Sequence, residues 1–359
     1  VFDFGDTFEG SRTRMRVGED HPRTHPGGRL ALNANLLYRL ASRFRDPEAQ
    51  GVVKWLEGFG ETNQEDFWSL LWYDPSVPAA PMSAMEPWYH FRDHGVVFWR
   101  SDWTPAATAF AFKAGPPEGH AAAGLMRRFP DWHFSTGHAH PDANSFILYG
   151  DSSYYTGDTG YAGVPMTAHH NTLLVDGKGQ AKEGEGHDAF FGFPYASMEG
   201  IRIAEVRLER GRAYVRGEAA AAYAPELGVE RFTRHFYLQS PQRITVCDEV
   251  RTRQPRRFTT LFHADERIDS LAPNRFVLGD GLRATVVAPS AVETRVGPHI
   301  LTAPGAPGSV DKGERQERGK VLSVTTAAPA TEARILTLLE APGAPGVMGS
   351  SASCPRPAR

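Results

Sequence analysis

The pattern of apolar residues near the start of the chain has the period of an α-helix. Apolar side chains recur at alternating spacings of four and three residues, which places them on one helical face. Asp46-Pro47 is expected to end the first helix, since proline cannot continue it. Residues 1–85 are therefore predicted to form a helical segment, too short to close a hydrophobic core by itself. The three helices that the pattern predicts cover residues 30–44, about 48–58 and about 64–73.

From about residue 95 the pattern changes to that of β-strands. Short runs such as "NSFILYG" and "RITVCDEV" are rich in β-branched and aromatic residues and are separated by Gly, Pro, Asp or Asn. About a dozen runs follow one another with no convincing helix between them. The fold class predicted is mainly β, with a large antiparallel β-sandwich over residues 86–340 after the short α-helical segment. Within it, residues 303–320 are expected to be a mobile loop, and residues 341–359, rich in Pro, Gly and Ser, a disordered tail.

Composition and charge exclude several classes of protein. The chain of 359 residues is 41% hydrophobic and 23% charged, as is typical of a globular protein. No run of eighteen apolar residues occurs, so a membrane span is not expected, and a formal charge of −3 argues against a globally basic nucleic-acid-binding protein. Cys247 and Cys354 are the two cysteines, which excludes a disulfide framework. A bridge between them is not expected either, because Cys354 lies in the low-complexity tail.

Histidines are concentrated in residues 133–180, which hold five of the fourteen in the chain: His133, His138, His140, His169 and His170. In an extended strand, His138 and His140 would face the same side, about 7 Å apart. Asp158 follows an apparent strand-turn-strand segment, and His170 is expected to begin the next strand. Two imidazoles and a carboxylate on neighbouring strands favour a site for zinc or another divalent metal. The alternative is that these histidines are loop residues with ordinary polar contacts.

An H-x-H pair also begins the metal motif of cupins. A cupin would have a glutamate about four residues after the second histidine, where this chain has Asn144. The second cupin motif, Pro-x-Gly ahead of a third histidine, is absent around Pro165. A cupin-like metalloenzyme is therefore kept only as an alternative.

The segments "GHAHPDANSFILYGDSSYYTGDTGY" and "HHNTLLVDGKGQ" resemble the heparinase II/III-like polysaccharide lyases. The upstream segment "WYHFRDHGVVFWRSDW" is similar to the first strand of that family's β domain, so the residues before it would be the end of the family's helical toroid. The family includes lyases of heparin, heparan sulfate and alginate, and related uronyl epimerases. The resemblance thus implies an enzyme that cleaves an acidic, uronate-containing polysaccharide, and a periplasmic or extracellular location.

The resemblance also implies a role for each site residue. His138 would face the substrate as a catalytic group, while His140, Asp158 and His170 would bind a divalent metal, usually Zn²⁺, that braces the site. His169 would not coordinate together with His170. In the β-elimination that such lyases perform, a base removes the C5 proton of the uronate and an acid protonates the 4-linked oxygen. Imidazole suits either task, because it generally titrates near neutral pH.

The chain departs from the family pattern in one respect. The family's catalytic Tyr, and the Asn or His that neutralises the substrate carboxylate, come from the toroid, well over a hundred residues before the H-x-H. Only 137 residues precede His138 here, and no residue is matched to those groups. Tyr38, Tyr73 and Tyr89 are interpreted as packing residues. The prediction is a polysaccharide lyase, of which this chain holds part of the active site. The alternative is a non-catalytic carbohydrate-binding or structural β-sandwich.

Overall fold

The computed structural model describes residues 4, 34–58, 67–129, 137–151, 153–158, 160, 162–184, 186–193, 195–264, 266–302, 313–344 and 354. They fall into two compact units. The first holds the described residues from Ala34 to Pro87, and the second holds Phe4 and the described residues from Trp88 onward. Within these residues no helix is both long enough and apolar enough to cross a membrane.

The first unit is helical. Its helices are α1 (Ala34–Phe44), α2 (Pro47–Glu57), α3 (Phe67–Trp72) and the 3-10 turn η1 (Met82–Ala84). These positions confirm the three predicted helices within the described residues. Asp46 ends α1 and also caps α2, because its side chain accepts hydrogen bonds from the backbone N–H groups of Glu48 and Ala49 at 2.9 and 3.2 Å.

The core of the helical unit is small. Tyr38 and Val53 are its buried centre, and the ring of Tyr38 lies edge-on to Tyr73 with centroids 5.2 Å apart. Tyr38 and Tyr73 are therefore packed against each other, as their interpretation as packing residues predicts. Several apolar side chains on the same helices stay exposed, among them Phe44 and Leu70.

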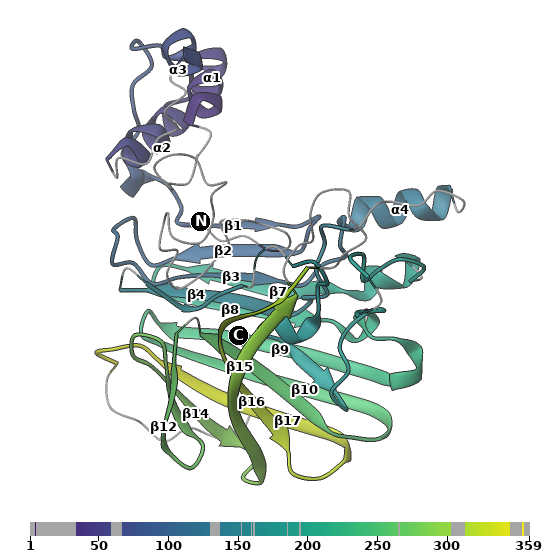
Figure 1. Ribbon diagram of the computed structural model, residues 1–359. Coiled ribbons are helices and arrows are strands. Elements are labelled where there is room, and N and C mark those ends of the chain that lie inside the picture. Colours follow the sequence, from purple (N-terminus) through teal and green to yellow (C-terminus); the bar gives the residue numbers. More distant parts are fainter. Residues whose placement is uncertain are drawn as a thin grey trace. The chain divides into compact units, whose positions relative to one another are not determined.

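The second unit contains three antiparallel sheets, which confirms the predicted fold class (Figure 1). The five-stranded sheet has the order β1-β2-β3-β4-β5, with bounds Trp88–Phe91, Val96–Arg100, Ala109–Lys113, Ser145–Gly150 and Ser153–Thr156. The eight-stranded sheet has the order β12-β13-β14-β17-β10-β9-β8-β7, with bounds Ile268–Ala272, Arg275–Leu278, Leu282–Ala288, Ala330–Glu340, Arg243–Arg256, Val229–Ser240, Arg212–Glu218 and Arg202–Glu209. The four-stranded sheet has the order β15-β16-β11-β6, with bounds Val292–Thr302, Arg315–Thr326, Phe258–Ala264 and Leu173–Val175.

Four fully buried phenylalanines join the sheets into one core. Phe110 on β3 packs on Phe236 of β9, with ring centroids 4.7 Å apart. Phe146 on β4 lies 5.1 Å from Phe236 and 6.2 Å from Phe262 of β11. Each of the three sheets therefore contributes rings to one continuous hydrophobic cluster.

Three predictions about the second unit need correction. A helix, α4 (His120–Arg128), does lie between strands; its alanines favour helix, and Arg127 and Arg128 suit its C-terminal end (Figure 1). The predicted loop 303–320 is partly strand, because β16 begins at Arg315, opposite Thr302 of β15; residues 303–312 lie outside the described residues.

The short 3-10 turns of the second unit are η2 (Thr167–His169), η3 (Tyr195–Gly200), η4 (Ala220–Ala222) and η5 (Pro225–Leu227).

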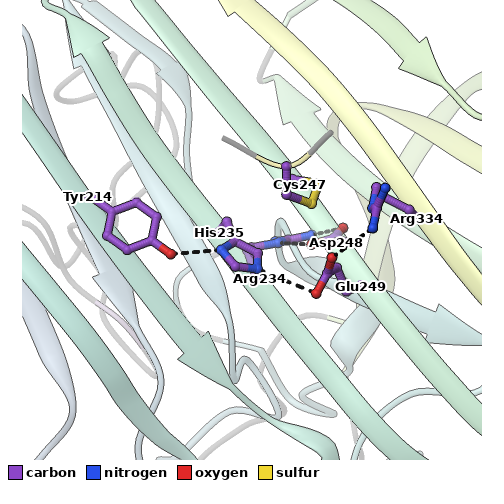
Figure 2. The surroundings of a disulfide bond; sticks show 8 residues. Tyr214, Arg234, His235, Cys247, Asp248, Glu249 and Arg334 are labelled. Carbon is purple, nitrogen blue, oxygen red and sulfur yellow. Dashed lines mark hydrogen bonds and ion pairs between the residues drawn. A yellow bond between two sulfur atoms is a disulfide. The ribbon is translucent and has the colours of Figure 1, made fainter. Parts of the chain in front are cut away.

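The third correction concerns the cysteines. Cys247 on β10 and Cys354 form a disulfide with their Cα atoms 5.6 Å apart, so the expectation of no bridge is wrong (Figure 2). The low-complexity composition of the tail means that it has few apolar residues to bury. This does not prevent Cys354 from forming a covalent bond with Cys247. Of the predicted disordered tail 341–359, only residues 341–344 and 354 are described.

Candidate metal centre and substrate-facing histidine

His140, Asp158 and His170 come together in the second unit. One ligand atom from each lies within 4.8 Å of the other two, and all three residues are buried. His140 precedes β4, Asp158 follows β5, and His170 follows η2, so the group lies where three connections meet. The structure therefore brings together the three residues that the sequence predicts as metal ligands.

The three side chains form a hydrogen-bonded chain. His170 Nδ1 lies 2.8 Å from Asp158 Oδ2, and His170 Nε2 lies 3.2 Å from His140 Nδ1. When His170 Nδ1 donates to the carboxylate, its Nε2 lone pair is directed at His140. A carboxylate that orients an imidazole in this way is common around protein-bound metals. Two ring nitrogens that face each other beside a carboxylate fit a divalent cation of the zinc type.

The charges in this group depend on one another. Burial disfavours the charged form of His170, but the adjacent Asp158 carboxylate outweighs burial and raises the pKa of His170. Burial alone would raise the pKa of Asp158, yet its interactions with His170 and His140 hold that pKa below the usual value. The carboxylate thus stays ionised in a buried place and attracts positive charge to it.

His138 lies beside this group but is exposed, and its ring meets that of His187 with centroids 5.8 Å apart. The prediction that His138 and His140 share one strand face is wrong. They lie in an irregular turn, in which Asp142 N donates to His140 O at 2.9 Å and Ser145 N donates to Asp142 O at 2.9 Å. Proline at position 141 and the turn-forming residues after it favour this bend over a strand. His170 likewise lies in the connection before β6 rather than at the start of that strand.

His169 brings no ligand atom to the metal group, although its ring lies 6.4 Å from that of His170. The ring of His169 accepts a hydrogen bond from Met166 N at 3.3 Å, and it lies 5.6 Å from the ring of His299. Burial lowers the pKa of His169 to about 3, so this ring is neutral at physiological pH.

Arg234, which the sequence analysis missed, connects the loops that carry the metal group. Its Nη1 donates to the backbone oxygens of Asn144, at 2.8 Å, and Asn171. Its Nε and Nη2 bind the two oxygens of Asp248 at 2.6 and 2.7 Å. Both residues are buried at core-facing positions of β9 and β10. A charged residue in register with apolar neighbours, such as Arg234 between Phe232 and Phe236, is the signal that could have revealed it.

Gln180 supports the same loops from the end of the "HHNTLLVDGKGQ" segment. Its amide pairs with both backbone groups of Ala143: Ala143 N donates to Oε1 and Nε2 donates to Ala143 O, each at 2.9 Å. The Glu183 carboxylate accepts from Thr167 N at 2.5 Å and from Gly179 N at 2.8 Å, and burial raises its pKa. These hydrogen bonds to Glu183 hold the segment from Thr167 to Glu183 as a closed loop that contains His170.

Solved structures with a similar fold include several polysaccharide lyases. A protein described as a heparinase III gene product aligns with a TM-score of 0.56 and 16% identity, covering 85% of this chain and 41% of its own. A heparan sulfate lyase from Pedobacter heparinus aligns with a TM-score of 0.53 and 14% identity, covering 86% and 42%. A heparinase III aligns with a TM-score of 0.53 and 13% identity, covering 84% and 42%. At these identities the likeness establishes the fold, and the chain spans about two fifths of the length of these proteins.

The sequence itself matches a family model. Residues 86–337 match the model described as heparinase II/III-like, C-terminal. The match covers most of the chain and includes the histidine-rich segment, the metal group and all but the last residues of β17, so the cupin alternative is set aside. By its sequence and by its fold, the chain belongs to the heparinase II/III-like family.

Proposed function

We propose that this chain is the C-terminal part of a polysaccharide lyase that cleaves a uronate-containing glycan, heparan-like or alginate-like, by β-elimination. The observation that carries the proposal is the exposed His138, two residues from the buried group of His140, Asp158 and His170, in a heparinase II/III-like domain. The solved relatives named as heparinase III and heparan sulfate lyase support an acidic glycosaminoglycan as the substrate class.

In this proposal, His140, Asp158 and His170 hold a divalent metal, Zn²⁺ by the nature of the donors. When bound, the ion cross-links three connections and so fixes the turn that carries His138. His138 transfers one of the two protons at the glycan. Either it removes the proton from C5 while a second group, outside this chain, protonates the oxygen that leaves C4, or it protonates that oxygen while the second group takes the C5 proton. The C5–H and C4–O bonds break, a C4–C5 double bond forms, and the chain is cleaved.

We also propose that the protein works in the periplasm or outside the cell. The Cys247–Cys354 disulfide supports this location, because disulfides persist in oxidising compartments and are rare in the cytosol.

The metal is tested by elemental mass spectrometry of the purified chain that has not been exposed to chelator. We expect about one equivalent of zinc in the wild type, and its loss in His140→Ala together with a fall in thermal stability, because an ion bound only by the native state stabilises that state. His138→Ala is the matched control and should keep the metal. A metal-free wild type that is folded, or a His138→Ala variant that loses the ion while His140→Ala keeps it, contradicts the assigned roles.

The reaction is tested by incubating the longer protein that contains this chain with heparan sulfate or alginate and following the ultraviolet absorbance of unsaturated uronate products. Formation of product by the wild type and its loss in His138→Ala, with metal retained, supports the proposal. Binding of these glycans without any product, both in this chain and in the longer protein that contains it, favours the non-catalytic carbohydrate-binding alternative.

A further inference from the structure

A second group of side chains that could bind a metal lies around the Cys247–Cys354 disulfide, on one face of the eight-stranded sheet (Figure 2). This is the face opposite to that of Arg234 and Asp248, which point into the core. His235, Glu249 and Cys354 each place one ligand atom within 4.8 Å of the other two. Cys247 adds a second sulfur, because it is bonded to Cys354. Two sulfurs, an imidazole and a carboxylate are all ligands that zinc accepts in proteins.

The strands preform this cluster. Cys247 on β10 lies directly opposite His235 on β9, and Glu249 is two residues further along the same face of β10. Cys247 and His235 are buried, and the Glu249 side chain is only 17% exposed. Three of the four donors are thus held on paired strands, which fix side-chain positions better than loops do.

Neighbouring side chains orient the donors. Tyr214 Oη lies 2.8 Å from His235 Nδ1, and an Nδ1–H donated to that oxygen leaves the Nε2 lone pair directed at Glu249. Nε2 is 3.7 Å from Glu249 Oε2. Arg334 Nη2 donates to the other carboxylate oxygen, Oε1, at 3.2 Å. Partners of this kind set the tautomer of a ligating histidine and the direction of a ligating carboxylate (Figure 2).

We propose that reduction of the Cys247–Cys354 disulfide converts this cluster into a Zn²⁺ site with two cysteines, one histidine and one glutamate as ligands. With a phosphine as reductant, the S–S bond breaks and phosphine plus water become phosphine oxide, which leaves two thiols. Zn²⁺ then displaces the two thiol protons and binds both thiolates, His235 Nε2 and Glu249 Oε2. In the oxidised protein the sulfurs are bonded to each other, so disulfide and ion are alternative states of the same residues.

The test is a titration of the full chain with Co²⁺, oxidised and after phosphine reduction under anaerobic conditions. Thiolate ligands give Co²⁺ an intense ultraviolet charge-transfer absorption, which the sulfur-free group of His140, Asp158 and His170 does not produce. We expect this absorption in the reduced chain only, and its loss when Zn²⁺ is added. The His140→Ala variant should show the same absorption, which separates this site from the one in the proposed function.

Matched variants test the two ligands that are not sulfur. His235→Gln and Glu249→Gln should each weaken Co²⁺ binding at least about tenfold. Glu230→Gln, which changes an exposed carboxylate on β9 that pairs with Arg251, should leave Co²⁺ binding unchanged. Two cysteines that bind cobalt by themselves would give equal affinity in all these variants, and that result overturns the proposal. A folded, reduced wild type without charge-transfer absorption overturns it as well.

Reduction could also unfold the chain, which circular dichroism would reveal. The proposal then requires Co²⁺ to restore both the fold and the charge-transfer absorption. A reduced chain that stays unfolded in the presence of Co²⁺ contradicts it.

Discussion

Arg234 is a single residue that links two loops of the candidate metal centre. Its guanidinium is fully buried, binds both oxygens of Asp248, and reaches the backbone of Asn144 and Asn171 in the two loops around the metal group. Such an ion pair need not stabilise a fold relative to well-packed apolar residues, but removal of one partner leaves the other charge buried and unpaired.

We therefore expect Arg234→Met to lower the free energy of unfolding by about 3–5 kcal/mol, measured by urea denaturation. The double variant Arg234→Met/Asp248→Leu should recover part of this loss, because no unpaired charge remains in the core. Zinc affinity should be lower than in the wild type in Arg234→Met and should stay low in the double variant, since neither loop regains its link to the other. If the double variant is no more stable than Arg234→Met, the loss of stability comes from the missing contacts to the loops and not from the unpaired Asp248 carboxylate.

His263 is a buried residue that makes stability depend on pH. Its backbone N–H donates to Asn171 Oδ1 at 2.7 Å, and its ring Nε2 lies 2.9 Å from Ala168 O. Burial lowers the pKa of His263 to about 4 from the ordinary value of 6.5. At pH 7 the ring is neutral in both the folded and unfolded states. Between pH 6.5 and 4 the unfolded chain takes up a proton that the folded chain does not.

Stability should therefore fall as the pH is lowered from about 6.5 to 4, by about 3 kcal/mol from this residue. His263→Gln keeps an N–H group that can reach Ala168 O but removes the titration. The measurement is the free energy of unfolding of both proteins at several pH values in this range. At pH 6.5 the variant should have the lower free energy of unfolding, and this free energy should fall less on acidification than that of the wild type. If the free energies of the two proteins fall in parallel with pH, His263 does not bind the proton on unfolding.

At the scale of elements, Gly217 on β8 marks a close contact between two sheets. A methyl group there would lie 2.8 Å from the ring of Phe112 on β3 and would also collide with the Asn144 side chain. Asn144 in turn donates to the backbone oxygen of Gly217 at 3.4 Å. The absence of a side chain at Gly217 thus lets the five-stranded and eight-stranded sheets approach next to the turn that follows His140.

Gly217→Ala should lower the free energy of unfolding by about 1–3 kcal/mol, as overpacking of a close contact does. Gly297→Ala on β15 is the matched control, because nothing lies within 4 Å of the added methyl group, and its effect should stay within about 0.5 kcal/mol. Thermal denaturation of the two variants checks this difference. Equal stability would mean that the sheets can move apart at Gly217 without loss.

The elements that the sequence predicts well are those with a strong local pattern. The runs that became β10 and β11 alternate or concentrate apolar residues within a few positions, so a short window suffices to detect them. α4 was missed because its apolar pattern is weak and it lies among strands. The edge strand β12 was missed because four of its five positions are exposed, among them Leu271, and so do not follow the pattern of a buried face.

At the scale of the whole molecule, the metal group was predictable and its support was not. His140, Asp158 and His170 lie within one short segment and carry a recognisable spacing, so the sequence alone indicated them together. Arg234 and Asp248 come from strands much further along the chain, and their relation to that segment exists only once the sheets pack. The turn at His138 and His140 is a different case, because Pro141 and the turn-forming residues after it are local signals for the bend that replaced the expected strand.

The bond between Cys247 and Cys354 spans 107 positions of sequence. The protein is therefore not a simple linear chain of covalent bonds, because part of it forms a ring. Every strand from β11 to β17 belongs to one closed loop of covalent bonds, which the main chain and the two sulfurs complete. Hydrolysis of any single peptide bond inside that loop would open it without releasing a fragment. Between Cys247 and Cys354, one cut by a protease leaves a single covalent molecule until the disulfide is also reduced.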